Sequence, residues 1–222
     1  MLKPDYERDG VRLYIADALT FLRDCPDMAF GAIVTDPPYN CNCKYDVHPD
    51  DMPPAEYEAS CAEWFAECRR VATRTIIFPG HGNLWMWGRI AKPSGVGCWY
   101  KPGNPSGGGV FQFCEWEPWL MWGKPIGRSD VIRATITEQR GVGKHPCPKP
   151  LPLLDALMLR LKDAECICDP FMGSGTTGVA AVRHGKRFEG CDISCAYYRI
   201  SKRRIDAELR QGRFEFEEAR NA

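Results

Sequence analysis

A glycine-rich turn between an apolar strand and a helix limits the fold of this chain more than any other feature. The segment ECICDPF (165–171) predicts a buried strand, and GTTGVAAVRHG (175–185) predicts a helix that Gly185 ends. The turn, GSGTTG (173–178), matches the pattern G-x-G-x-x-G, in which glycines let a ligand approach the amide groups at a helix N-terminus. A strand, a tight turn and a helix in this order indicate an α/β fold.

Apolar strands alternate with helices along the rest of the chain. The run FGAIVTD (30–36) is continuously apolar, as expected of a strand buried on both faces of a sheet. The segments 96–101 and 117–124 predict a hairpin, and GRFEFEEARNA (212–222) is interpreted as a charged tail. The pattern predicts one domain, residues 1–222, with a seven-stranded, mostly parallel sheet and helices on both faces. Strands are expected at residues 11–17, 30–36, 75–80, 96–101, 117–124, 165–171 and 186–193, and helices at 18–25, 54–73, 83–91, 151–164, 175–185 and 194–210.

Composition narrows the class of protein without choosing a ligand. No apolar run approaches the ~20 residues of a membrane-spanning helix, and MLKPDYERDG lacks the apolar region of a signal peptide, so we expect a cytoplasmic protein without a membrane partner. Lys plus Arg and Asp plus Glu number 29 each, so a polyanion partner would have to meet a local basic patch. The twelve cysteines include no C-x-x-C pair, and we therefore expect reduced thiols and no metal site.

A stiff polar loop follows the strand at residues 30–36. In TDPPYN the prolines Pro37 and Pro38 fix the backbone and donate no hydrogen bond, so Asp36 and Tyr39 lie on a loop with free carbonyl groups. Such a loop either only ends the strand or presents acceptors and an aromatic face to a flat polar ligand. If this strand and the strand at 165–171 are parallel neighbours, both loops lie at the carboxyl edge of the sheet, where α/β folds bind ligands.

An acid at the end of the next strand extends the glycine-rich site. Asp192 ends the strand at 186–193, where a carboxylate can accept hydrogen bonds from ribose hydroxyls. The turn and this acid predict a nucleoside-bearing cofactor; the alternative is a turn that binds nothing. A nicotinamide-dependent oxidoreductase is a further alternative, but only one helix and a tail follow Asp192, and a dehydrogenase has no use for TDPPYN.

Both loops carry motifs of a known family. Residues 36–39, DPPY, and residues 171–175, FMGSG, resemble the catalytic loop and the FxGxG cofactor loop of the amino-group DNA methyltransferases that use S-adenosylmethionine. DPPY precedes FxGxG here, which is similar to the permuted order called the beta class. HPCPKP (145–150), YIAD (14–17) and GCDI (190–193) resemble further segments of that class, so the resemblance spans about residues 11–210.

The resemblance implies a Rossmann-like methyltransferase fold and gives roles to individual residues. Asp36 and the Pro37 carbonyl would accept the N–H groups of a base amino nitrogen, and Tyr39 would stack on a base flipped out of the duplex. Lys149 and the helix after it would hold the methionine carboxylate, whereas His145 is equally an ordinary loop histidine. The implied catalytic residues are Asp36, Pro37, Pro38 and Tyr39, and the implied cofactor-binding residues are Asp17, His145, Lys149, Asp169, Phe171, Gly173, Ser174, Gly175, Thr176, Thr177 and Asp192.

The base and the DNA contacts are less sharply determined. In this family an acid at the first loop position is more typical of adenine-N6 methylation, so Asp36 favours adenine, with cytosine-N4 as the alternative. RNA or protein amide methylation, and DNA binding without catalysis, are more remote alternatives. The expected partner is double-stranded DNA, and the class also allows a homodimer and a cognate restriction enzyme. We expect residues 41–51 to close over the flipped base and residues 102–146 to include a small recognition insertion, although the basic segment 123–144 is alternatively a solvated loop. The expected DNA-binding residues are Asn40, Lys44, Lys124, Arg128, Arg133 and Arg140.

Overall fold

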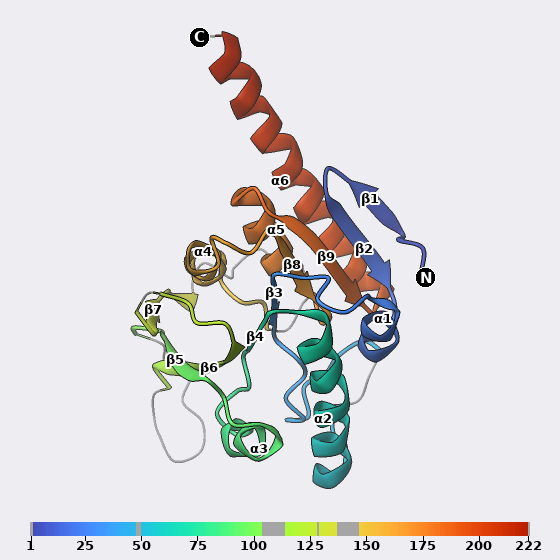
Figure 1. Ribbon diagram of the computed structural model, residues 1–222, viewed down its shortest axis with the longest axis vertical. Coiled ribbons are helices and arrows are strands. Elements are labelled where there is room, and N and C mark those ends of the chain that lie inside the picture. Colours follow the sequence, from blue (N-terminus) through green and yellow to red (C-terminus); the bar gives the residue numbers. More distant parts are fainter. Residues whose placement is uncertain (1, 48–49, 104–113, 128, 137–146, 222) are drawn as a thin grey trace.

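The computed structural model describes residues 2–47, 50–103, 114–127, 129–136 and 147–221, which form a mixed β-sheet flanked by helices (Figure 1). The strand order is β1-β2-β9-β8-β3-β4-β6-β5-β7. The strands are β1 (Tyr6–Arg8), β2 (Val11–Ile15), β3 (Ala32–Thr35), β4 (Arg74–Ile77), β5 (Gly95–Tyr100), β6 (Trp116–Gly123), β7 (Val131–Arg133), β8 (Cys166–Asp169) and β9 (Arg187–Asp192).

The middle of the sheet is parallel. Strands β2, β9, β8, β3 and β4 all run in one direction, while β6 runs antiparallel to β4 and pairs with β5 as the predicted hairpin. The predicted count of seven strands was wrong, because the described residues form nine. The two additional strands, β1 and β7, are three residues long and bury no more than one side chain each. Such short edge strands carry too little apolar pattern to be found in a sequence.

Helices cover both faces of the sheet, as predicted (Figure 1). One face packs against α1 (Ala18–Asp24), α2 (Pro54–Val71) and α3 (Leu84–Ile90). The other packs against α4 (Leu151–Arg160), α5 (Thr176–Arg183) and α6 (Cys195–Asn221). The backbone of α6 is helical to Asn221, so the interpretation of the segment after residue 211 as a tail outside the helix was wrong.

The central strands are buried on both faces, which fixes the frame of the site. Ile33, Val34, Ile76 and Ile167 have no exposed surface. Burying an aliphatic side chain of this size stabilises a fold by ~1.5–3 kcal/mol. Because β2, β9, β8 and β3 are parallel, the loops that follow them meet at one edge of the sheet.

Two further observations concern the chain as a whole. No disulfide joins the twelve cysteines, all of which lie in described segments. Within the described residues, no helix combines the length and the apolar character needed to cross a membrane.

Candidate active site

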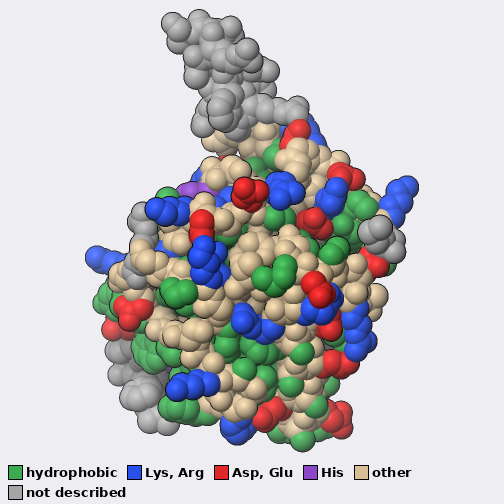
Figure 2. Space-filling model, in the orientation of Figure 1, with side chains coloured by type: hydrophobic (Ala, Val, Ile, Leu, Met, Phe, Trp, Pro, Cys, Tyr) green, Lys and Arg blue, Asp and Glu red, His purple; other side chains and the backbone are tan. Residues whose placement is uncertain are grey.

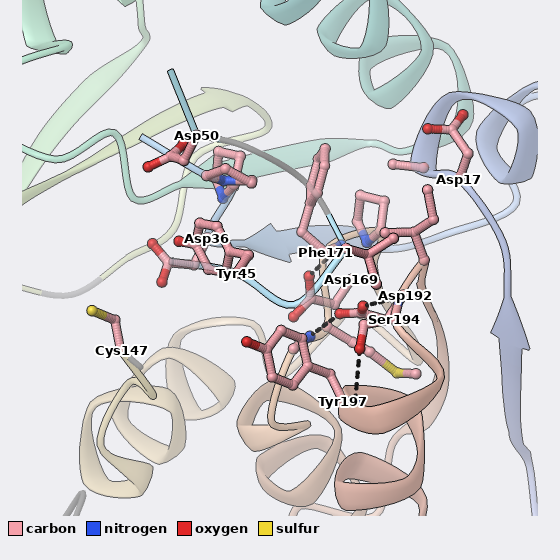
Figure 3. A pocket seen from close by; sticks show the side chains of 18 of the residues that line it. Asp17, Asp36, Tyr45, Asp50, Cys147, Asp169, Phe171, Asp192, Ser194 and Tyr197 are labelled. Carbon is pink, nitrogen blue, oxygen red and sulfur yellow. Dashed lines mark hydrogen bonds between the residues drawn. The ribbon is translucent and has the colours of Figure 1, made fainter. Parts of the chain in front are cut away.

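A cavity of about 310 Å³ lies at the carboxyl edge of the sheet (Figure 3). Asp17 and Asp36 lie on opposite sides of it, and Phe171, Asp169 and Asp192 lie between them. This volume is at the lower end of the range for small-molecule sites. The cavity brings together most of the residues that the sequence predicted, namely Asp17, Asp36, Pro37, Pro38, Asn40, Lys149, Asp169, Phe171, Gly173, Ser174, Thr176, Thr177 and Asp192.

The loop after β3 is held by hydrogen bonds from two other elements. The Tyr57 hydroxyl of α2 donates to the Pro38 carbonyl at 2.7 Å, and Asn83 Nδ2 donates to the Tyr39 carbonyl at 2.8 Å. Within the loop the Tyr39 hydroxyl donates to Asp36 Oδ1. Together with the two prolines, these contacts fix the loop before any ligand binds, which is the preorganisation that an electrostatic site needs.

Asp36 is also paired with a lysine from the HPCPKP segment. Lys149 Nζ is 2.6 Å from Asp36 Oδ2 and 3.0 Å from the Tyr39 hydroxyl oxygen. Burial raises the pKa of Asp36 above its ordinary value, although Lys149 and Tyr39 act in the opposite direction by stabilising the carboxylate. Burial and the neighbouring Asp36 raise the pKa of Tyr39 well above its ordinary value, so its hydroxyl stays protonated and donates. The sequence predicted Lys149 beside the cofactor; in the structure Lys149 lines the cavity, and its amine contacts Asp36 and Tyr39 of the catalytic loop.

The glycine-rich loop after β8 contacts the acid that ends β9. The backbone N–H of Gly173 donates to Asp192 Oδ2 at 2.9 Å, and that of Ser194 donates to Oδ1 at 2.8 Å. Each carboxylate oxygen can accept a further hydrogen bond. Burial raises the pKa of Asp192 to about 6, so the group is ionised at neutral pH and can receive hydroxyl donors.

Helix α6 supports the same loop from outside the cavity. Gly175, at the start of α5, has φ of +78°, and a Cβ added there would lie 2.6 Å from Ser201 Cβ. This close approach and the left-handed backbone both require glycine. Arg204 Nη1 donates to the Ser174 carbonyl and, at 3.0 Å, to Thr176 Oγ1. Gly175 and Arg204 therefore shape the loop without lining the cavity.

Two predicted acids make protein contacts that define their surroundings. Asp169, which is 3% exposed, accepts hydrogen bonds at Oδ1 from Thr35 Oγ1 at 2.7 Å and from the Phe171 N–H at 3.1 Å. Burial raises the pKa of Asp169 to about 7. Asp17 begins α1, and its Oδ1 accepts the Thr20 N–H at 3.0 Å. Both acids line the cavity: Asp169 also joins β3 and β8 through a buried hydrogen bond, whereas Asp17 lies at the N-terminus of α1.

The segment after the catalytic loop contains cavity residues that sequence reasoning missed. Asp50, 5% exposed, accepts the backbone N–H groups of Asn40, Cys41 and Cys43 at 2.7 to 3.1 Å. The Ser194 hydroxyl donates to Asp46 at 2.6 Å, which joins this segment to the end of β9. The only sequence signal for these residues was their proximity to DPPY, because a polar segment without periodicity predicts no particular structure. The missed cavity residues include Tyr45, Asp46, Asp50, Tyr57, Trp64, Ser194 and Tyr197.

The predicted DNA-binding residues are dispersed. Both polar groups of the Asn40 amide pair with the Met52 backbone, at 2.8 and 2.6 Å, so this side chain holds the loop. Lys44 is exposed on the segment after the catalytic loop. Arg133 is exposed at the end of β7, opposite Tyr100, and so lies at the carboxyl edge of the sheet.

Lys124 is not brought to the site. It follows Gly123, which pairs with Arg74 at the amino end of β4, and its Nζ is 2.8 Å from Asp163 Oδ2. Lys124 therefore lies at the opposite edge of the sheet from Asp36. The predicted site residues Arg128, Arg140 and His145 lie outside the described residues, as does much of the 102–146 segment.

The cavity residues fit a nucleoside-bearing cofactor. Phe171 meets Trp64 edge-on with ring centroids 5.0 Å apart, which gives an apolar wall beside the glycine-rich loop. Next to this wall, the Asp192 carboxylate and the amide groups at the start of α5 provide acceptors and donors for hydroxyl and carboxylate groups. An apolar wall with a few convergent polar groups is typical of such sites.

Comparison with known proteins agrees with this arrangement. Residues 117–203 match the family model described as DNA methylase. The chain is 44% identical to the type II methyltransferase M2.DpnII of Streptococcus pneumoniae, over 94% of each protein. Two solved structures share its fold at low identity. These are the cytosine-N4-specific PvuII DNA methyltransferase (TM-score 0.69, 18% identity, 91% of this chain and 89% of that one) and the M1.HpyAVI–SAM complex (TM-score 0.65, 21% identity, 88% and 98%).

A relative at this identity, covered almost from end to end, establishes the family. The chain belongs to the S-adenosylmethionine-dependent DNA amino-methyltransferases. Within that class it is similar in sequence to type II methyltransferases, including M2.MboI of Moraxella bovis at 26% identity over 91% of each protein.

Proposed function

We propose that this protein transfers the methyl group of S-adenosylmethionine to the exocyclic N6 of an adenine flipped out of double-stranded DNA at a specific site. The observation that carries the proposal is the placement of two loops. The DPPY and FMGSG loops follow the neighbouring parallel strands β3 and β8, and residues of both loops line the same cavity. Acceptors for an amino group and a nucleoside site in one cavity are what a transfer between the two ligands requires.

The catalytic loop would activate the amino nitrogen, which is a poor nucleophile while its lone pair is conjugated with the ring. Hydrogen bonds from its N–H groups to the Asp36 carboxylate and the Pro37 carbonyl favour a pyramidal nitrogen with an available lone pair. The contacts of Tyr57 and Asn83 hold these acceptors in place, so little reorganisation is needed when the base arrives. Asp36 accepts such hydrogen bonds at both oxygens only as a carboxylate.

The other half of the cavity would hold the cofactor, which when bound supplies an electrophilic methyl group. Asp192 would accept the ribose hydroxyls, and Phe171 with Trp64 would contact the apolar part of the nucleoside. The resemblance in sequence assigns the adenine end to Asp17 and the methionine end to residues 173–177. In this arrangement Asp169 contributes by holding β3 against β8.

The choice of adenine rests on Asp36. An acid at the first position of this loop is more typical of the adenine-N6 enzymes of the family, and M2.DpnII and PvuII do not decide between the bases. Cytosine presents the same N–H donors to the loop, so the product has to be identified directly. Membership of the family removes the nicotinamide-dependent alternative.

The DNA would approach the carboxyl edge of the sheet, where Lys44 and Arg133 are exposed. Figure 2 shows positive and negative side chains interspersed over the visible face rather than gathered into one basic patch. We assign sequence recognition to the insertion within residues 102–146.

The direct test is incubation with mixed-sequence duplex DNA and methyl-labelled S-adenosylmethionine, followed by digestion and identification of the modified nucleoside. N6-methyladenine is the expected product. N4-methylcytosine would support the mechanism but contradict the choice of adenine as the target base. Label in RNA or protein but not in DNA would contradict DNA as the substrate.

A further inference from the structure

Lys149 lies between two carboxylates, and the chemistry described so far uses only one of them. Its Nζ is 2.6 Å from Asp36 Oδ2 and 3.8 Å from Glu117 Oε2, and its side chain is 10% exposed. Glu117, at the cavity end of β6, binds Lys101 Nζ at 2.6 Å through its other oxygen. A row of alternating charges thus leads from the catalytic loop to the β5–β6 hairpin, in the order Asp36, Lys149, Glu117 and Lys101. Burying charged groups costs stability unless they are paired. We therefore ask what this row of charges does in the site.

Both oxygens of the Asp36 carboxylate already accept a donor in this structure. Asp36 Oδ1 receives the Tyr39 hydroxyl and Oδ2 receives Lys149. A base amino group that binds Asp36 therefore competes with these donors for the carboxylate, although each oxygen retains a second acceptor site. Tyr39 is fixed three residues away on the same stiff loop, whereas Lys149 has a flexible stem and a second carboxylate within reach.

We propose that Lys149 is a positioning residue that holds the Asp36 carboxylate in the empty site and moves onto Glu117 when the base amino group binds Asp36. The inference rests on the proposed function, because it takes the amino group as the incoming donor. In the empty site Lys149 orients Asp36. In the loaded site it forms a closer pair with Glu117, so both carboxylates have a donor in both states.

The electrostatic surroundings support this exchange. Burial raises the pKa of Asp36 and Lys149 opposes that rise; Glu117, Asp169, Tyr45 and Cys147 also face this acid. Burial acts against ionisation of Glu117 too, yet Lys149 and Lys101 lower its pKa below the ordinary value. Glu117 is therefore an ionised acceptor at neutral pH.

Three full-length variants test the exchange. Lys149→Met and Glu117→Gln each remove one charge at nearly constant shape, and Lys162→Met removes an exposed lysine outside the cavity as the control. For each protein we would record thermal unfolding, the Kd for S-adenosylmethionine, and kcat and KM for duplex DNA between pH 5.5 and 9. Lys149→Arg, which keeps the charge, replaces Lys149→Met if the latter does not fold.

The two site variants are expected to differ. Lys149→Met should lower kcat about 10- to 100-fold, with an acid limb of the pH profile moved to higher pH and a cofactor Kd within about twofold of the wild type. Glu117→Gln should raise KM for DNA about tenfold without moving the acid limb to higher pH, because loss of a negative neighbour lowers the pKa of Asp36. Lys149→Arg should keep the acid limb near that of the wild type, and Lys162→Met should match the wild type throughout.

Other results would overturn the exchange. An unchanged kcat and pH profile in Lys149→Met, or in Lys149→Arg a displaced acid limb, excludes the role at Asp36. A weaker cofactor Kd with unchanged kcat assigns Lys149 to the cofactor carboxylate instead. Wild-type kinetics in Glu117→Gln excludes the second acceptor. Failure of the proposed function itself is distinguishable, because then the wild-type protein would not methylate DNA.

Discussion

Thr35 Oγ1 donates a hydrogen bond to Asp169 Oδ1 at 2.7 Å, and this buried contact joins the last residues of β3 and β8. The catalytic loop starts at the residue after Thr35, and the cofactor loop starts at the residue after Asp169. This contact and the backbone pairing of β3 with β8 therefore set the spacing of the two halves of the site within the protein, before any ligand binds.

Thr35→Val should loosen this spacing. The substitution keeps the shape of a fully buried side chain but removes the donor, which should destabilise the fold by about 1–3 kcal/mol. Urea unfolding measures the stability, and methyl transfer to DNA should fall in the folded variant. Thr20→Val, at an exposed position of α1, is the matched control and should change neither quantity. Equal effects of both variants would contradict the account.

Asp169→Asn should change the pH dependence of stability. Because the pKa of Asp169 is raised to about 7, the folded state holds its proton more tightly than the unfolded chain does, and stability from this group falls as pH rises from about 4 to 7. The asparagine variant lacks that loss, so it should be more stable than the wild type by about 2–4 kcal/mol at pH 8 and similar to it at pH 4. Unfolding midpoints across that range test the prediction, and parallel curves for the two proteins would refute it.

Arg204→Met should weaken cofactor binding. The variant leaves the Ser174 carbonyl and Thr176 Oγ1 without the donor that holds the glycine-rich loop from α6. Without this charged donor the loop is less well held, and we expect the cofactor Kd to rise about 10-fold. Calorimetric titration with S-adenosylmethionine measures it. Arg203→Met, an exposed neighbour on α6, should retain wild-type affinity.

Gly175→Ala should destabilise the protein more than Gly185→Ala. Both residues have positive φ, +78° and +67°, but a Cβ at Gly175 would lie 2.6 Å from Ser201 Cβ, whereas a Cβ at Gly185 meets open space. Backbone strain alone costs about 1 kcal/mol. The difference between the two unfolding free energies isolates the steric clash. A difference near zero would show that α6 shifts to accommodate the added Cβ at no cost.

Asp36→Ala should abolish methyl transfer while leaving the cofactor Kd nearly unchanged. In the proposed mechanism the carboxylate is the acceptor for the base amino group, and its contacts are to Tyr39 and Lys149 rather than to the glycine-rich loop. Single-turnover methylation and cofactor titration should be measured on the same preparation. Loss of both activities together would make Asp36 a structural residue.

Much of this site was predictable because the motifs combine backbone and chemical constraints. Pro37 and Pro38 restrict the backbone, and the glycines of FMGSG permit positive φ, so their loops carry a signal independent of distant contacts. The carboxyl ends of parallel strands lie at one edge of a sheet, so the sequence alone predicted that Asp36, Asp169 and Asp192 lie close together.

Contacts between distant segments were not predictable in the same way. The partner of Lys149, the pairing of Asp46 with Ser194 and the loop held by Asp50 depend on how irregular segments lie in space. A polar segment without periodicity does not determine this. The three-residue strands β1 and β7 were missed for a related reason, since pairing with a neighbour, not an apolar pattern, makes them strands.

The strand order has a consequence for how the molecule is made. β8 and β9 are synthesised late, yet they lie between β2 and β3, which are synthesised early. A chain emerging from the ribosome therefore has no sheet centre until residues 166–192 are available, and β2 and β3 each lack one of their two neighbouring strands until then. Such non-local pairing slows folding. Assembly of the methylation site is thus a late event of biosynthesis, and a truncated chain that ends before β8 would lack the cofactor loop and one of the two strands that flank β3.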